Sequence, residues 1–290
     1  ILQDLAGPKI RVGKIKEGGA ELRRREKFLL TNREIMGDEK GASVTYSSFP
    51  DEVKPGDRIL LSDGTIELRV LKSDGQDIQC EVVVGGVLTS HKGINLPTGT
   101  IQAKTFTEKD HEDLLFGIQK GVDLIGLSYV KGASDIEAVK RFLKKESADI
   151  PVIAKIERKE ALEKIDEILL ASDGIMVARG DLGVETPIEK IPTVQKMLIR
   201  KANSLGKPVI TATQMLRSMV DHTQPTRAEV TDVVNAIFDG TDAVMLSEET
   251  ASGRFPVEAL QMMDKIARAA EEEFPFDQFL KRGFDGITDL

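Results

Sequence analysis

A lysine and two carboxylates stand at the ends of two short apolar runs, where they could bind a metal ion and an anion together. The run 152–154 ends in Lys155 and Glu157, and the run 174–178 ends in Arg179-Gly180-Asp181. Carboxylate oxygens are the ligands that Mg²⁺ prefers, and a lysine ammonium is a point charge suited to phosphate. These residues predict a metal-assisted site for a small anionic substrate. The competing interpretation is that all three are ordinary surface charges capping buried strands.

The segment between the two runs indicates how they are held. Leu162, Ile165, Ile168 and Leu169 recur at spacings of three and four, which is typical of a helix. Strand, helix and strand in this order form a parallel α/β unit, and ligands in such folds bind at the carboxyl ends of the strands. The spacing therefore predicts that Lys155, Glu157 and Asp181 share one end of a parallel sheet.

The same alternation extends from Thr105 to the last helix and favours a (β/α) barrel over an open sheet. Polar groups follow each apolar strand, and no glycine-rich dinucleotide or P-loop motif occurs. The expected strands are 122–130, 152–156, 175–178, 209–213 and 243–247. The expected helices begin with one opened by a capping box at Thr107 and Asp110, followed by helices at about 133–147, 158–171, 190–205, 226–238 and 256–273.

Residues 12–97 have a different texture. Short alternating runs are separated by turn pairs such as Gly18-Gly19, Asp63-Gly64 and Asp74-Gly75. This pattern predicts a small antiparallel β-barrel, either a passive domain or a lid over the site. The predicted domains are a catalytic barrel from 1–11 and 98–275, the inserted lid at 12–97, and a linker or tail at 276–290.

Composition excludes several classes of function. The 290 residues carry 40 basic and 48 acidic side chains and a formal charge of −8, which argues against nucleic-acid binding. No apolar stretch is long enough to span a membrane. A single cysteine, Cys80, excludes an intrachain disulfide and fits a reducing, cytoplasmic location.

Eight long motifs, in family order, give the chain a strong resemblance to pyruvate kinase over nearly its whole length. They are LQDLAGPKIRVG (2–13), ILLSDGTIEL (59–68), HKGINLP (91–97), VIAKIER (152–158), GIMVARGDLGVE (174–185), VITATQML (209–216), PTRAEVTDV (225–233) and DGTDAVMLSEETA (239–251). The resemblance implies a TIM-type (β/α)₈ barrel, incomplete at its N-terminus, with an inserted antiparallel β-barrel lid. It also implies the glycolytic transfer of a phosphoryl group from phosphoenolpyruvate to ADP, giving pyruvate and ATP, in a homo-oligomer.

The resemblance assigns roles residue by residue. Catalytic roles fall to Lys155, Thr213, Arg11 and Ser247, with Glu249 beside Ser247 in a polar relay. The substrate contacts fall to Arg11, Gly180, Asp181 and Thr213. The Mg²⁺ or Mn²⁺ ligands are Glu157 and Asp181, and the lid residues on the nucleotide side are Asp63 and Lys92.

The chain departs from the family in its monovalent-cation region, at Asp4, Leu5 and Lys9. Potassium-dependent relatives have threonine in place of Leu5 and glutamate in place of Lys9. An ammonium at Lys9 could occupy the place of the cation, so we expect any activity to be independent of K⁺.

The resemblance also implies that two barrel strands and a C-terminal domain are missing. An unclosed barrel exposes strand edges, so we expect marginal stability or association that covers the gap. Two alternatives to an active kinase remain. One is a truncated, non-catalytic homologue that assembles with full-length subunits. The other is a different Mg²⁺-dependent barrel enzyme acting on pyruvate or phosphoenolpyruvate.

Overall fold

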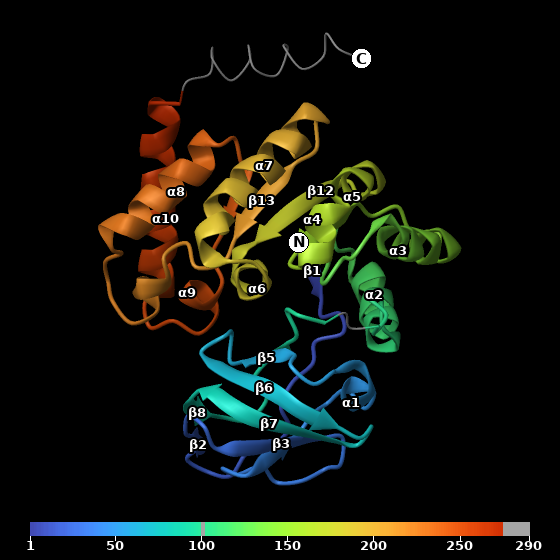
Figure 1. Cartoon of the computed structure of the whole chain (residues 1–290). Coiled ribbons are helices and arrows are strands. Elements are labelled where there is room, and N and C mark those ends of the chain that lie inside the picture. The colour runs from blue at the N-terminus through green and yellow to red at the C-terminus, as the bar shows by residue number, and fades with distance from the viewer. Residues whose placement is uncertain (100–101, 275–290) are drawn as a thin grey trace. The chain divides into compact units, whose positions relative to one another are not determined.

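The computed structural model describes residues 1–99 and 102–274, so the predicted linker at 276–290 lies outside the described residues. The chain divides into two compact units (Figure 1). Of the described residues, the barrel unit contains Ile1–Leu5, Thr105–Gly183 and 188–274. The lid unit contains 6–99, 102–104 and Val184–Pro187. No helix within the described ranges is long and apolar enough to cross a membrane.

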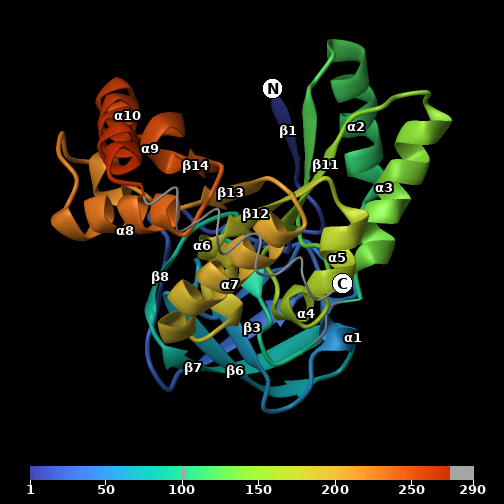
Figure 2. The ribbon, with the colours of Figure 1, turned by 90° about the horizontal axis from the view of Figure 1, so that it is seen from above.

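The barrel unit is built on one curved, wholly parallel sheet of six strands. Their order across the sheet follows the chain: β1 (Leu2–Leu5), β10 (Leu124–Leu127), β11 (Val152–Ile156), β12 (Gly174–Ala178), β13 (Val209–Ala212) and β14 (Ala243–Met245). Seen from above, β1 and β14 lie at opposite ends of the curve (Figure 2). The predicted α/β fold with an incomplete barrel is thereby confirmed.

Helices follow the strands, and the longer ones pack against this sheet. The longer ones are α2 (Glu108–Lys120), α3 (Ala133–Lys145), α7 (Ile191–Ser204), α8 (Arg227–Phe238) and α10 (Pro256–Glu272). The shorter ones are α4 (Lys159–Glu163), α5 (Ile165–Ala171), α6 (Arg179–Glu185), α9 (Glu248–Ala251) and the 3₁₀ turns η1 (Ile188–Lys190) and η2 (Arg217–Val220). The predicted capping box at Thr107 and Asp110 is present and opens α2.

One predicted helix is divided. The segment expected as a single helix at 158–171 forms α4 and α5, which are separated at Lys164 with φ −116° and ψ 20°. Ala161, Ile165 and Ile168 are buried on either side of the break. Because a continuous helix would bury the same positions, hydrophobic spacing alone does not reveal the break.

Strand periodicity fixes which side chains face the inside of the barrel. In β11, Val152, Ala154 and Ile156 belong to the large core between sheet and helices. Ile153 belongs instead to a small inner cluster with Met176 and Ala212. Since side chains alternate along a strand, Lys155 follows Ile153 onto the inner face, where it is 9% exposed.

The lid unit is a mainly antiparallel β structure with its own core. Its six-stranded sheet has the order β4 (Gly41–Ser43), β3 (Lys27–Thr31), β7 (Asp77–Val84), β6 (Ile66–Ser73), β5 (Arg58–Leu61) and β9 (Ile94–Asn95). A second pair joins β2 (Ala20–Leu22) to β8 (Gly86–Leu88), and one short helix is α1 (Phe49–Glu52). Phe28, Leu30, Ile59 and Leu68 lie in its core with almost no exposure.

The segment 10–13 closes this sheet into a barrel. Val12 bridges Val44 beside β4, and Arg11 bridges Gly93 beside β9. Backbone bonds of 2.8 Å from Gly13 N–H to the Ser43 carbonyl and from Val12 N–H to the Lys92 carbonyl hold the closure. One pair departs from the predicted antiparallel pattern, because β3 and β4 run parallel. The connection at 32–40 is longer than a hairpin turn and returns the chain in the same direction.

Candidate active site

Lys155 is a buried lysine at the centre of a charge cluster in the barrel unit. Its ammonium donates to both carboxylate oxygens of Asp4 at 2.8 and 3.1 Å and to the Ser128 hydroxyl at 2.8 Å. It also lies 3.1 Å from Oε1 of Glu157. Burial opposes the charged form, but Glu157 and Asp4 outweigh it and raise the pKa of Lys155 above its ordinary value. The side chain therefore presents a fixed positive charge at the strand end.

Glu157 is held as firmly as Lys155. It is 3% exposed, and its Oε2 accepts a 2.7 Å hydrogen bond from the backbone N–H of Tyr129. Burial raises the pKa of Glu157, Lys155 lowers it and the charge of Asp181 raises it, for a net increase. Tyr129 also reaches the second predicted metal ligand, because its hydroxyl lies 3.5 Å from Oδ1 of Asp181.

The paired carboxylates suit a magnesium ion. The charge of Asp181 raises the pKa of Glu157, and a divalent cation would relieve that repulsion. In the part of the chain that the structure describes, no group of three or more His, Cys, Asp or Glu forms a ready-made metal cage. Mg²⁺ is commonly held by one or two carboxylates together with water and substrate phosphate, so a two-carboxylate site fits it.

Thr213 and Gly180 meet at the neighbouring strand ends. The Gly180 N–H donates a 2.8 Å hydrogen bond to the Thr213 hydroxyl, which itself donates to the Ala212 carbonyl at 2.6 Å. Thr213 has φ 71° and Gln214 has φ 57°, in the left-handed region that β-branched residues rarely adopt. The structure thus brings together two of the predicted substrate contacts, already bonded to one another.

Ser247 and Glu249 form a third group, beyond β14. Glu249 is 1% exposed and accepts from the backbone N–H groups of Ser247 at 2.8 Å and Leu216 at 3.1 Å. The Ser247 hydroxyl is buried with no hydrogen-bond partner among the described residues. A buried donor without a partner is costly, so this hydroxyl is free to bond a ligand or water.

Four of the remaining predicted residues lie in the lid unit, where strand pairing gathers Arg11, Asp63 and Lys92. The guanidinium of Arg11 donates to the His91 carbonyl at 2.8 Å, one residue before Lys92. Asp63 follows Ser62, whose N–H bonds the Gly93 carbonyl at 3.2 Å. Lys9 is half-buried in this unit, whereas Asp4 and Leu5 belong to β1 in the barrel unit.

Three contacts at the strand ends were not assigned a role by sequence reasoning. They are the bond of Asp4 to Lys155, the hydrogen bond from Tyr129 to Glu157, and the bonds of Arg179 to Asp232 and Thr213. The only sign of them in the sequence is that Ser128, Tyr129 and Arg179 are polar residues at the ends of apolar strands. The Asp4 contact joins residues 151 positions apart and depends on the pairing of β1 with β10.

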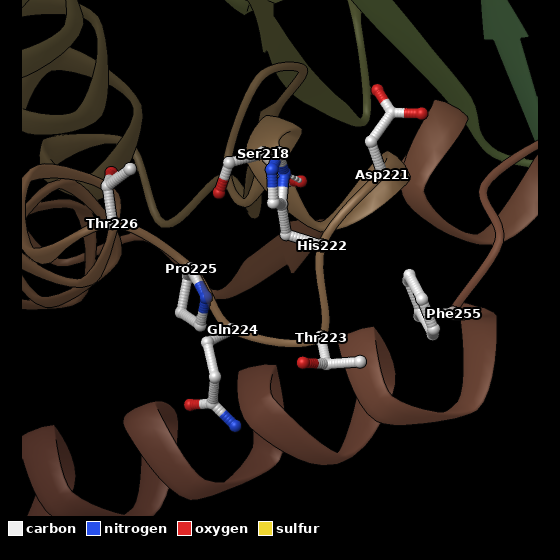
Figure 3. A pocket seen from close by; sticks show the side chains of 8 residues that line it. All are labelled: Ser218, Asp221, His222, Thr223, Gln224, Pro225, Thr226 and Phe255. Carbon is white, nitrogen blue, oxygen red and sulfur yellow. Dashed lines mark hydrogen bonds between the residues drawn. The ribbon is translucent and has the colours of Figure 1, made fainter.

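A cavity of about 520 Å³ lies away from these residues. It is lined by Ser218, residues 221–226 and Phe255 (Figure 3). His222, which the sequence indicated as a surface residue, is exposed there, with Nδ1 3.1 Å from the Ser218 carbonyl oxygen. None of the predicted site residues lines this cavity.

The fold and the strand-end residues define a (β/α)-barrel protein that gathers its charged groups at the carboxyl ends of the strands. The family model described as "Pyruvate kinase, barrel domain" matches residues 1–260. The chain belongs to the pyruvate kinase family.

Similar proteins include three that are named pyruvate kinase. The chain is 57% identical over 272 residues to "Pyruvate kinase" of Thermococcus litoralis, covering 94% of this chain and 57% of that one. It is 48% identical to "Pyruvate kinase" of Thermotoga maritima, covering 100% of this chain and 62% of that one. It is 52% identical to "Pyruvate kinase 2" of a Synechocystis species, covering 94% of this chain and 47% of that one. The chain therefore spans about half to three-fifths of the length of these relatives.

Proposed function

We propose that this chain catalyses the Mg²⁺-dependent transfer of a phosphoryl group from phosphoenolpyruvate to ADP. The bond between phosphorus and the enol oxygen breaks, and a new bond forms to a terminal oxygen of ADP. The enolate that leaves takes a proton at its methylene carbon and becomes pyruvate. Membership of the family supports the proposal, and the buried pair Lys155 and Glu157, with the exposed Asp4 bonded to Lys155, is the observation that carries it.

The residues of the cluster suit the electrostatic demands of this reaction. Phosphoryl transfer asks the protein mainly to position the reactants and to offset negative charge. Lys155 would neutralise charge on the phosphoryl group, and its bonds to Asp4 and Ser128 would hold it still. Glu157 and Asp181 would hold Mg²⁺, which when bound supplies further positive charge to the phosphoryl oxygens.

Thr213 and the lid residues complete the proposal. The backbone N–H of Asp181 would bind the substrate carboxylate beside the Thr213 hydroxyl, which the Gly180 N–H holds in place. Arg11, Asp63 and Lys92 enter through the resemblance alone, as contacts of the phosphate and the nucleotide. Closure of a lid would exclude water, so that ADP and not water receives the phosphoryl group.

The test is pyruvate formation from phosphoenolpyruvate and ADP by the purified chain with Mg²⁺. We expect Lys155→Met to lower turnover by roughly 10²–10³-fold, because the charge that offsets the phosphoryl group is lost. Lys201→Met, which removes a lysine paired with Asp166 at the surface, should leave turnover unchanged. A wild-type chain at background would contradict the proposed activity for this chain, as would equal rates in the wild type and Lys155→Met.

The same assay tests the proposed independence from K⁺, which rests on Lys9 and Leu5. Replacing K⁺ by tetramethylammonium at constant ionic strength should change turnover by less than about twofold. A large rise in turnover with K⁺ would show that Lys9 does not substitute for the cation.

A further inference from the structure

Arg179 makes a dense set of contacts that the proposed chemistry does not use. It is the first residue of α6, and its side chain is 9% exposed. Nη1 donates to both oxygens of Asp232 on α8, at 2.8 and 2.7 Å, and to Oε1 of Gln195 on α7 at 3.3 Å. A cation is unfavourable at a helix N-terminus, so α6 itself gives no reason for an arginine here.

The other guanidinium nitrogen reaches the strained turn after β13. Nη2 donates a 2.8 Å hydrogen bond to the backbone carbonyl of Thr213 and contacts Sδ of Met215 at 2.7 Å. That carbonyl belongs to the peptide between Thr213 and Gln214, the two residues with positive φ. Such a conformation costs on the order of 1–3 kcal/mol and persists only where surrounding contacts impose it.

We propose that Arg179 is a positioning residue that holds the Thr213 hydroxyl against the Gly180 N–H. Asp232 and Gln195 fix one edge of the planar guanidinium, and the other edge fixes the Thr213 carbonyl. These bonds orient the peptide group between Thr213 and Gln214. Lysine cannot reproduce the arrangement, because an ammonium lacks the rigid fork that serves both partners. The expected effect on turnover rests on the proposed function, whereas the expected effect on the hydrogen bond between Gly180 and Thr213 does not.

A cavity beside Arg179 makes the idea testable by chemical rescue. Arg179, Gln195, Asp232 and Asn235 are among the residues that line a space of about 280 Å³ between α7 and α8. Nε of Arg179 is buried there without a hydrogen-bond partner within the described ranges. A small guanidinium ion could enter this space once the arginine side chain is shortened.

The first experiment reads the Gly180 amide and needs no turnover. In ¹⁵N-glycine-labelled full chain, we expect Arg179→Lys to speed hydrogen exchange at Gly180 by at least tenfold, as Thr213→Val does by removing the acceptor. Arg268→Lys, in an exposed pair with Asp264 on α10, should leave Gly180 unchanged. Gly174, a buried glycine of β12, reports whether the barrel stays folded. Wild-type exchange at Gly180 in Arg179→Lys, with Thr213→Val accelerated, would overturn the proposal.

The second experiment tests the catalytic consequence. We expect Arg179→Ala to lower kcat by roughly 10²-fold, the cost of a displaced contact group, with the KM for ADP changed less than about twofold. Millimolar methylguanidinium should restore part of the lost kcat. In a Thr213→Val background, Arg179→Lys should cost no more than about a further twofold, because both changes disturb one unit. Multiplicative losses in the double variant would overturn the proposal, and an inactive wild type would contradict the proposed function while leaving the Gly180 result to stand.

Discussion

At the scale of single residues, charge balance explains the character of the strand-end cluster. One ammonium, on Lys155, is bonded to Asp4 and lies beside Glu157, and Asp181 stands nearby through the Tyr129 hydroxyl. Glu157 and Lys155 are buried, Asp181 is half-buried and Asp4 is exposed. The buried guanidinium of Arg158 lies 6.0 Å from the centre of the Tyr129 ring. The two predicted metal ligands thus add their negative charges at the end of the strands. Such a site favours a divalent cation, which would offset the excess and then attract an anionic substrate.

The cysteine gives a prediction at the same scale. Burial raises the pKa of Cys80 from 9.0 to about 12, because a thiolate at this position would lose its hydration. The folded-state pKa is the higher one, so the thiol stabilises the fold below about pH 9 and this contribution is lost as the pH rises. Above pH 9 the unfolding free energy should fall by about 1.4 kcal/mol per pH unit more than in Cys80→Ala.

Urea unfolding of the wild type and Cys80→Ala between pH 7 and pH 10.5 measures this difference. The alanine variant removes the titrating group, and its small packing defect shifts stability equally at every pH. Parallel pH dependence of the two proteins would show that Cys80 is accessible to solvent in the folded lid unit. Thiol labelling should agree, remaining slow until the lid unit unfolds, because only the thiolate reacts.

Sequence spacing predicted contacts between residues of one strand but could not predict contacts between residues of different strands. Lys155 and Glu157 are two positions apart at a strand end, so alternation predicts that they share a side, and the structure places them 3.1 Å apart. Asp4 could not be assigned to Lys155, because that contact depends on how β1 and β11 are registered through β10. The strain at Thr213 leaves no pattern in composition or periodicity.

At the scale of elements, helix starts were predicted closely, both with a capping box and without one, as at α3, which begins at Ala133. Thr226 and Glu229 form a second capping box and open α8 at Arg227, close to the expected helix at 226–238. The expected helix at 158–171 carried apolar spacing but no internal marker for its break at Lys164. A cap is a local contact written in adjacent residues, whereas the break depends on the surrounding structure.

Glu229 provides a prediction for this element. It accepts from the Ser218 hydroxyl and N–H and from the Thr226 N–H and hydroxyl, at 2.5 to 2.9 Å. Burial raises the pKa of Glu229, but these hydrogen bonds outweigh it and leave the pKa below its ordinary value. Because the pKa is lower in the folded state, the ionised Glu229 stabilises the fold above about pH 4.5, and this contribution is lost as the pH falls. Glu229→Ala should lose about 1 kcal/mol at pH 7, and less as the pH falls below 4.5.

The measurement is the urea unfolding free energy of wild type and Glu229→Ala at pH 7 and at two acidic values. Glu112→Ala, at an exposed position of α2, serves as the control and should change stability little. A Glu229→Ala defect that keeps its full size at the lowest pH would mean that the carboxylate charge does not support the cap.

At the scale of the whole molecule, the two units have separate cores, and the predicted site residues are divided between them. The large core of the barrel unit and the core of the lid unit share no residues. The predicted metal ligands and Lys155 belong to the barrel unit, whereas Arg11, Asp63 and Lys92 belong to the lid unit. The change from βα alternation to short antiparallel runs marked this division in the sequence, because each hydrophobic pattern suits a different kind of core.

The central claim is that the strand ends of the barrel unit form a metal site from Glu157 and Asp181. Titration of the purified chain with Mn²⁺, followed by the electron paramagnetic resonance signal of the free ion, tests it directly. We predict one site that Glu157→Gln and Asp181→Asn each weaken at least tenfold, while Asp264→Asn on the exposed face of α10 leaves it unchanged. Equal Mn²⁺ affinity in all four proteins would contradict the account, because the metal would then bind elsewhere or only adventitiously.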